Sequence, residues 1–109
     1  MLFDMSKTHI DPKLTLNIEK ALPNGDVGAV IGLYSTLDRS DGVCSDNAES
    51  VVDSMIARAE GESGKKVNDI QVFKGLCVLI VNCPADMMKI LLSYEEVKSA
   101  TPEGGFMAI

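Results

Sequence analysis

Four segments of the chain carry the hydrophobic patterns of β-strands. A continuous apolar run, rich in β-branched residues, covers Val27–Tyr34 and predicts a central strand. Polar and apolar residues alternate over Val67–Lys74, and a second apolar run follows closely over Leu76–Val81, so these two segments predict a hairpin. A last short strand is expected over Val97–Thr101.

Three other segments have apolar residues at helical spacing. Asp11-Pro12 is a favourable helix start, because Asp accepts free amides at the N-cap and Pro suits the first turn, so a short helix is expected up to Leu22. A second helix follows Ser45 or Asp46 and is expected to end at Gly61 and Gly64, and a third has Pro84 in its first turn. The apolar positions that define the three stripes are Leu14, Ile18, Ala21 and Leu22; Val51, Val52, Met55, Ile56 and Ala59; and Met87, Met88, Ile90, Leu91 and Tyr94.

After the first helix the expected order is therefore β-α-β-β-α-β. Two right-handed crossovers joined by a hairpin give an α+β, ferredoxin-like fold, a four-stranded antiparallel sheet with two helices on one face. We divide the chain into a loose leader with the short helix (1–25), a ferredoxin-like domain (26–103) and an extended C-terminal tail (104–109).

Composition narrows the possible partners. The chain has 109 residues, a net charge of −6 and a pI of about 4.6, which disfavours a nucleic-acid-binding surface or a polybasic membrane anchor. No apolar run has the length of a membrane span and no signal peptide is evident, so a cytoplasmic location is expected. Cys44, Cys77 and Cys83 form no CxxC pair, which favours free thiols. Cys77 is expected in mid-strand, as a small buried residue.

The sequence offers little for catalysis. The only histidine, His9, lies in the leader, whereas a nucleophile needs its base within hydrogen-bond reach. Asp38, Asp41 and Asp46 match a calcium loop poorly and are interpreted as a solvated loop. No phosphate-binding glycine motif is present. We therefore expect no enzyme activity, no cofactor and no metal.

The C-terminal tail is unusual because it is uncharged in its side chains and largely apolar. A chain end of this kind either folds back or offers its side chains to a partner, since each large apolar side chain left in water forgoes roughly 1.5–3 kcal/mol of burial free energy. Its residues are Gly104, Gly105, Phe106, Met107, Ala108 and Ile109.

Residues 30–109 resemble the inhibitor I9 family, the propeptides of subtilisin-like serine proteases and their free-standing inhibitor relatives. Ala29–Tyr34 resembles the opening strand of that family, and Val51–Glu60 its first helix. Val72–Val78 resembles its hairpin, and Met88–Ala100 the second helix running into the last strand.

This resemblance implies a ferredoxin-like protease inhibitor or folding helper that acts in trans. In such proteins the sheet packs on two surface helices of the protease, and the C-terminal residues extend into the substrate cleft on the non-primed side. By analogy Ile109 would occupy the primary specificity position, with Ala108 and Met107 behind it, and Phe106 would fill the fourth pocket. Glu103 would cap a helix N-terminus of the protease. An alternative is a non-enzymatic module that forms homo-oligomers through its sheet and tail.

Overall fold

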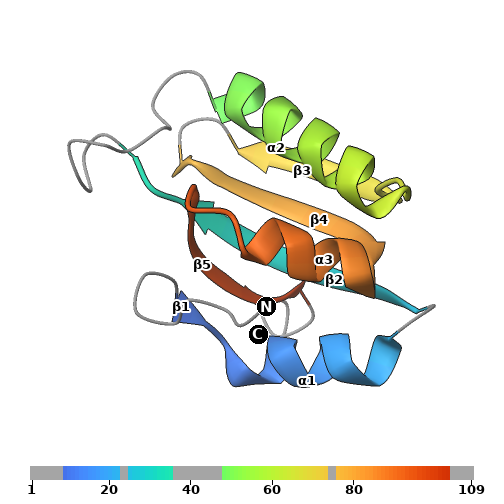
Figure 1. Ribbon diagram of the computed structural model, residues 1–109. Helices are drawn as coiled ribbons and strands as arrows, with labels where there is room; N and C mark the ends of the chain where they lie inside the picture. The colour runs from blue at the N-terminus through green and yellow to red at the C-terminus, as the bar shows by residue number, and fades with distance from the viewer. Residues whose placement is uncertain (1–8, 23–24, 36–47, 74–75, 104–109) are drawn as a thin grey trace.

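The computed structural model describes residues 9–22, 25–35, 48–73 and 76–103. This part of the chain contains three helices and five strands, which Figure 1 shows. In chain order they are β1 (His9–Ile10), α1 (Pro12–Ala21), β2 (Asp26–Leu33), α2 (Ala48–Ser63), β3 (Asp69–Phe73), β4 (Val78–Pro84), α3 (Ala85–Leu92) and β5 (Val97–Pro102).

The strands form one sheet in the order β1-β5-β2-β4-β3. The last four strands of that order pair antiparallel, whereas β1 pairs parallel with β5. The α+β class and the four antiparallel strands are thus confirmed, and the sheet has one strand more than the sequence predicts.

The extra strand, β1, corrects the interpretation of residues 9 and 10 as part of a loose leader. Ile10 pairs with Ala100 of β5 and is only 6% exposed. The Asp11 amide then donates to the Ala100 carbonyl at 2.9 Å, which continues the pairing into the helix start. Burial of one apolar side chain and backbone pairing together hold this short segment against the sheet.

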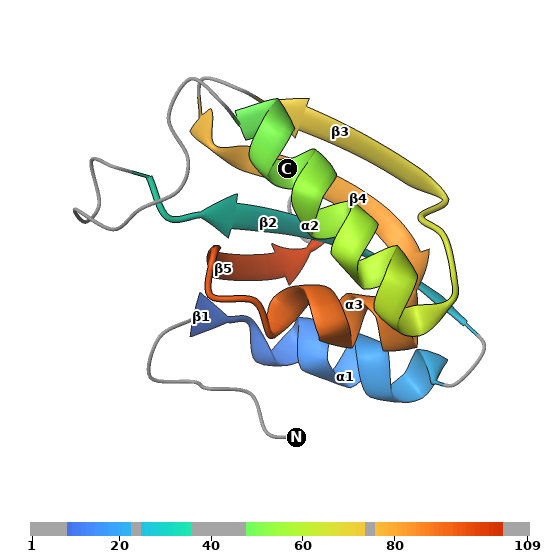
Figure 2. The same ribbon diagram turned by 45° about the horizontal axis from the view of Figure 1, so that its top comes forward.

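All three helices lie side by side on one face of the sheet, in the order α2, α3, α1 (Figure 2). The predicted start of α1 is confirmed: Asp11 is the N-cap, its Oδ1 accepts from the Lys13 amide at 2.8 Å, and proline follows it. Leu14 and Ile18 of α1 are buried in the same core as the other helices.

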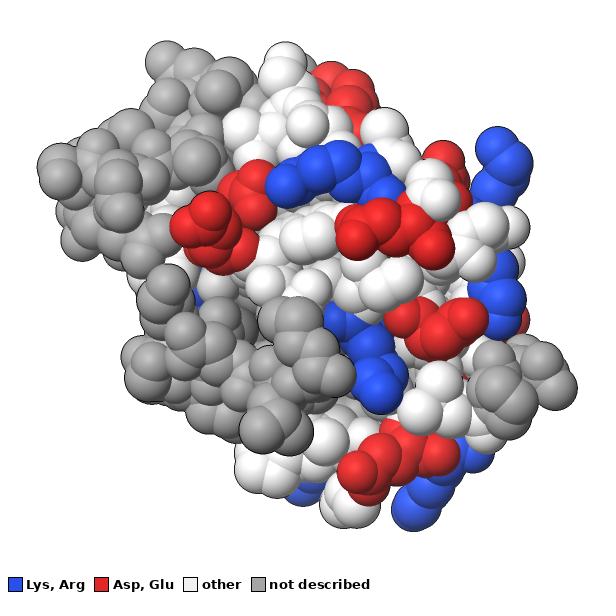
Figure 3. All heavy atoms as spheres, viewed as in Figure 1, with Lys and Arg blue, Asp and Glu red and all other residues white. Residues whose placement is uncertain are grey.

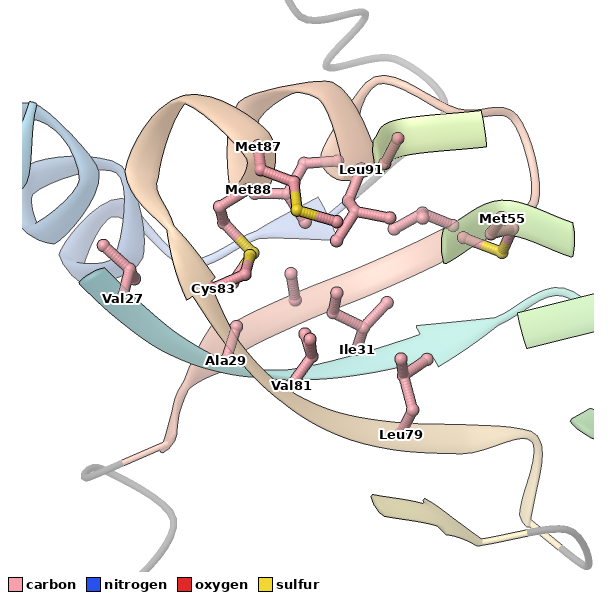
Figure 4. Close-up of a cluster of buried hydrophobic side chains, with 14 of the residues drawn as sticks. Val27, Ala29, Ile31, Met55, Leu79, Val81, Cys83, Met87, Met88 and Leu91 are labelled. Carbon is pink, nitrogen blue, oxygen red and sulfur yellow. The ribbon is translucent and has the colours of Figure 1, made fainter. Parts of the chain in front are cut away.

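The core lies between the sheet and the helices. Alternate residues of β2 and β4 point into it, and in Figure 4 Val27, Ala29 and Ile31 lie beside Leu79, Val81 and Cys83, facing α3. Met87, Met88 and Leu91 of α3 close over them and are fully buried. The methionines fill irregular space in this core, and none of its described buried residues is aromatic.

The strand predicted over Leu76–Val81 begins two residues later and runs to Pro84. Cys77 has a φ of 51°, so the chain turns there instead of continuing extended. Its carbonyl still accepts from the Leu33 amide at 2.9 Å, and Leu76 before it is 72% exposed. Cys77 is therefore buried at a turn and not in mid-strand, and Cys83 lies within β4.

Helix α2 passes through Gly61 and ends at Ser63. Gly64 follows with a φ of 72°, the left-handed conformation that ends many helices. Gly64 was therefore correctly identified as a helix end, whereas Gly61 is an interior residue. Ser45 and Asp46, the predicted caps of this helix, lie outside the described residues.

Candidate functional site

The sheet face opposite the helices is left uncovered by the described helices. Side chains of alternate strand residues point to it, because successive residues of a strand face opposite sides. We call this surface the open face; its members, from β3 to β5, are Asp69, Gln71, Phe73, Val78, Ile80, Asn82, Gly28, Val30, Gly32, Ser99 and Thr101.

The centre of the open face is apolar. Val30 on the central strand β2 lies between Ile80 of β4 and Thr101 of β5. Val30 and Ile80 are half-buried, whereas the alternate residues of the same strands lie in the core. An apolar centre with a polar margin is the composition of a protein-binding surface.

Two glycines of β2 leave room on this face for the side chains of Ser99, in β5, and of Glu103, the residue after β5. A Cβ added at Gly32 would stand 2.8 Å from the Ser99 hydroxyl. A Cβ added at Gly28 would stand 2.4 Å from Oε1 of Glu103 and 3.4 Å from Nδ2 of Asn82. The glycines thus leave the space that Ser99 and Glu103 occupy.

Glu103 is the one predicted binding residue that the structure describes. It directly follows Pro102, the last residue of β5, and its carboxylate lies over Gly28 on the open face. The amide of Asn82 lies beside the same glycine and accepts a hydrogen bond from Asn68 Nδ2 at 3.0 Å. The remaining predicted residues, Gly104 to Ile109, lie outside the described residues.

The open face was not predicted from the sequence. The signal was present in Gly28-Ala29-Val30-Ile31-Gly32, where the two glycines fall four residues apart and therefore on one face. A continuously apolar run hides this alternation, because Val30 is as hydrophobic as its buried neighbours. Only the pairing register shows which residues the strands bring together.

A cluster of charged and aromatic side chains lies on the helical side of the molecule. Arg58 of α2 forms an ion pair with Glu96 and stacks on the Tyr94 ring, with 4.3 Å between the guanidinium carbon and the ring centroid. The Tyr94 hydroxyl donates to Glu62. Burial first, and then the hydrogen bond to Glu62, raise the pKa of Tyr94 to about 12. These contacts tie α2 to the segment after α3, which is a structural role.

A second ion pair joins the end of α2 to the start of α3. Lys65 Nζ lies 2.9 Å from Asp86 Oδ2, and the hydrogen bond from Lys65 lowers the pKa of Asp86. Figure 3 shows acidic and basic side chains interspersed over this side of the molecule, without a field of one sign. We therefore interpret the two ion pairs as structural contacts.

The two described cysteines differ in state. Cys77 is disulfide-bonded, so the expectation of a free thiol is wrong for this residue. Cys83 is a free, fully buried thiol, and burial, followed by the charges of Asp26 and Asp86, raises its pKa to about 12. A thiol so far from ionising is a poor nucleophile. Cys44 lies outside the described residues.

Within the described ranges, no three side chains of His, Cys, Asp or Glu gather as they would around a metal ion. His9 lies in β1, and the acidic loop with Asp38, Asp41 and Asp46 falls outside those ranges. In the same part of the chain, no helix has both the length and the apolar character that crossing a membrane requires.

Comparison of the chain with family models, with curated proteins and with solved structures finds no match. The open face and the position of Glu103 therefore carry the functional argument.

Proposed function

We propose that this protein is an inhibitor or folding helper of subtilisin-like serine proteases, with a ferredoxin-like fold similar to that of the inhibitor I9 family. The strand order β5-β2-β4-β3 supports the fold, since β2-α2-β3 and β4-α3-β5 are then two crossover units joined by a hairpin. The order of elements also agrees with the segments of the chain that resemble the family.

The observation that carries the proposal is the position of Glu103 on the open face. An inhibitor of this kind presents its sheet to the protease and continues from the last strand into the substrate cleft. Here the residue after β5 lies on the face that no described helix covers, next to an apolar centre of Val30 and Ile80. A single partner that binds the open face would therefore also contact Glu103.

The open face has chemistry suited to helices of a partner. Val30 and Ile80 supply apolar contact at its centre. Glu103 adds a carboxylate, which is favoured at a helix N-terminus. No catalytic group is required, so the protein acts by occupying the protease and not by chemistry of its own.

The test is inhibition of a subtilisin by the full chain and by two lysine variants. Val30→Lys places a charge at the centre of the open face and is expected to weaken inhibition at least tenfold, because that charge loses its hydration in the complex. The matched control is Leu16→Lys, since Leu16 of α1 is 52% exposed on the opposite side of the molecule. Equal inhibition by both variants, or no inhibition by the full chain, would contradict the proposal.

A homo-oligomer that pairs through the same open face is the alternative, because its apolar centre is uncovered by any described element. Light scattering, together with the inhibition assay, distinguishes the oligomer from the inhibitor. The oligomer would be favoured if the protein is a dimer without affinity for subtilisin and if Val30→Lys converts that dimer to a monomer.

The state of Cys77 bears on where the protein works. A disulfide persists in oxidising compartments and is rare in the reducing cytosol. The disulfide at Cys77 therefore favours an extracellular or otherwise oxidising location over the cytoplasmic one that the sequence suggested.

A further inference from the structure

One edge of the sheet, formed by β3, has no partner strand among the described residues. The opposite edge is β1, which is two residues long, whereas β3 has five residues and neither a proline nor an irregularity in its register with β4. Short strands, prolines and bulges are the usual means by which proteins protect a sheet edge. β3 therefore presents the longer and less protected edge.

The pairing pattern of β4 shows which of its residues bond to which neighbour. The Leu33 amide donates to the Cys77 carbonyl, and the Ala85 amide donates to the Gly25 carbonyl, both at 2.9 Å. In an antiparallel ladder, residues that exchange hydrogen bonds alternate along the strand. Odd-numbered residues from position 77 to position 85 thus bond to β2, and the even-numbered residues of β4 bond to β3.

The same alternation identifies the open hydrogen-bonding groups of β3. Gln71 is opposite Ile80, an even-numbered residue, so the amide and carbonyl of Gln71 point toward β4. The carbonyls of its neighbours Ile70 and Val72 and the amide of Val72 therefore point away from the sheet. The Ile70 amide points the same way and donates to Oδ1 of Asp69 at 3.0 Å, an exposed contact that an added strand would replace. These groups form a template to which an extended segment can add as a further strand.

The side chains of Ile70 and Val72 also have apolar surface left to cover. They face the helical side, opposite Val81 and Leu79 of β4. The β4 residues are at most 1% exposed, whereas Ile70 and Val72 are only half-buried. A strand that pairs with β3 would complete the burial of both.

The flank of α2 that borders this edge is acidic. Glu60 reaches toward the chain that leads into β3, and its Oε2 accepts from the Val67 amide at 3.4 Å. Asp53 lies seven residues earlier, about two helical turns, and hence on the same flank. The opposite flank carries Arg58, which is already paired with Glu96. Lys66, exposed between α2 and β3, offsets only part of the acidic charge.

We propose that β3 is a docking edge for a basic, extended segment of a partner protein. The segment adds as a strand to Ile70 and Val72, and its lysine or arginine side chains on the helical side reach Asp53 and Glu60. Their aliphatic stems cover the remaining apolar surface. A second copy of this chain is a poor occupant, since two-fold pairing of β3 with itself brings the two acidic flanks together. This edge is separate from the open face.

The probe is a synthetic seven-residue peptide of alternating lysine and valine, and its control has glutamate in place of lysine. Titration of the ¹⁵N-labelled full chain is expected to shift the Ile70 and Val72 amides, with at least tenfold tighter binding of the lysine peptide. Val72→Pro removes one outward amide and abolishes binding, whereas Val72→Thr keeps that amide and retains binding. Equal binding of both peptides, or shifts confined to the open face, would overturn the proposal.

The contribution of the acidic flank to peptide binding is tested with separate variants. These variants also test the proposal if Val72→Pro does not fold. The double variant Asp53→Asn with Glu60→Gln keeps the surface polar and is expected to weaken binding of the lysine peptide at least threefold. Glu19→Gln, at an exposed position of α1, is the control and leaves binding unchanged. Equal loss of peptide affinity in the double variant and the control would overturn the proposed role of the acidic flank in binding. Concentration-dependent shifts of the β3 amides without peptide would overturn the proposal by identifying a second copy as the occupant.

Discussion

At the scale of single residues, two glycines three positions apart have opposite roles. Gly61 lies inside α2 with open space around its Cα, and Gly64 follows the helix with a φ of 72°. Gly61→Ala is expected to raise the free energy of unfolding by about 0.5–1 kcal/mol, because alanine loses less backbone entropy in a helix. Gly64→Ala is expected to lower it by about 1 kcal/mol, because alanine is strained in the left-handed region. Urea denaturation measures both, and equal signs would contradict the helix end as described.

Cys83 provides a second prediction at the residue scale. Its thiol has a pKa of about 12 in the folded protein, above the ordinary value of 9.0, because burial disfavours the thiolate. It should therefore resist iodoacetamide at pH 8 until the chain is unfolded in denaturant. The raised pKa also means that its stabilising contribution is complete below about pH 9 and is lost as the pH rises from 9 toward 12. Rapid alkylation of Cys83 in the folded protein would show that it is not buried.

At the scale of elements, α1 belongs to the core and is more than an appendage. Leu14 is fully buried beneath it, whereas Leu16 of the same helix is 52% exposed. Leu14→Ala is expected to lower the free energy of unfolding by about 2–5 kcal/mol, through lost burial and the cavity left behind. Leu16→Ala is the matched control and should change it by less than about 0.5 kcal/mol. Similar small effects of both substitutions would mean that α1 does not pack on the sheet in solution.

Elements with a strong local signal could be predicted from the sequence. Asp11-Pro12 identified the start of α1, and the apolar run beginning at Val27 identified β2 within one residue at each end. The strand β1 could not be predicted, because two residues carry no periodicity and its pairing with β5 comes from tertiary contacts. The late start of β4 depends on the φ of Cys77, a non-glycine residue whose turn conformation no local pattern indicates.

The candidate site was predictable only in part, because it also depends on contacts between segments that are distant in the sequence. The apolar character of the tail is evident in the sequence, whereas the last strand was expected to end at Thr101 and runs one residue further, to Pro102, directly before Glu103. The open face required the register, since residues from β2, β4 and β5 meet on it only after pairing. A charge pattern such as Asp53 and Glu60 beside β3 likewise becomes visible only when α2 is packed on the sheet.

At the scale of the whole molecule, three helices on one face leave the other face and the β3 edge as two separate surfaces. The open face is apolar at its centre, and the β3 edge has open backbone groups beside an acidic helix flank. A charge placed on one surface should leave the other unaffected. Val30→Lys is therefore expected to weaken protease inhibition without changing the affinity of the lysine peptide by more than twofold, as the same titration would measure. A parallel loss at both surfaces would indicate global unfolding.

The most direct test of the proposed function is the inhibition constant for a subtilisin of the full chain against a chain that ends at Gly105. Removal of Phe106, Met107, Ala108 and Ile109 takes away the side chains proposed to fill the substrate cleft. The three large ones, Phe106, Met107 and Ile109, are each worth roughly 1.5–3 kcal/mol of burial less the cost of ordering the segment. We predict at least a hundredfold weaker inhibition with an unchanged free energy of unfolding. Equal inhibition by the two chains, or none by either, would contradict the proposed mechanism.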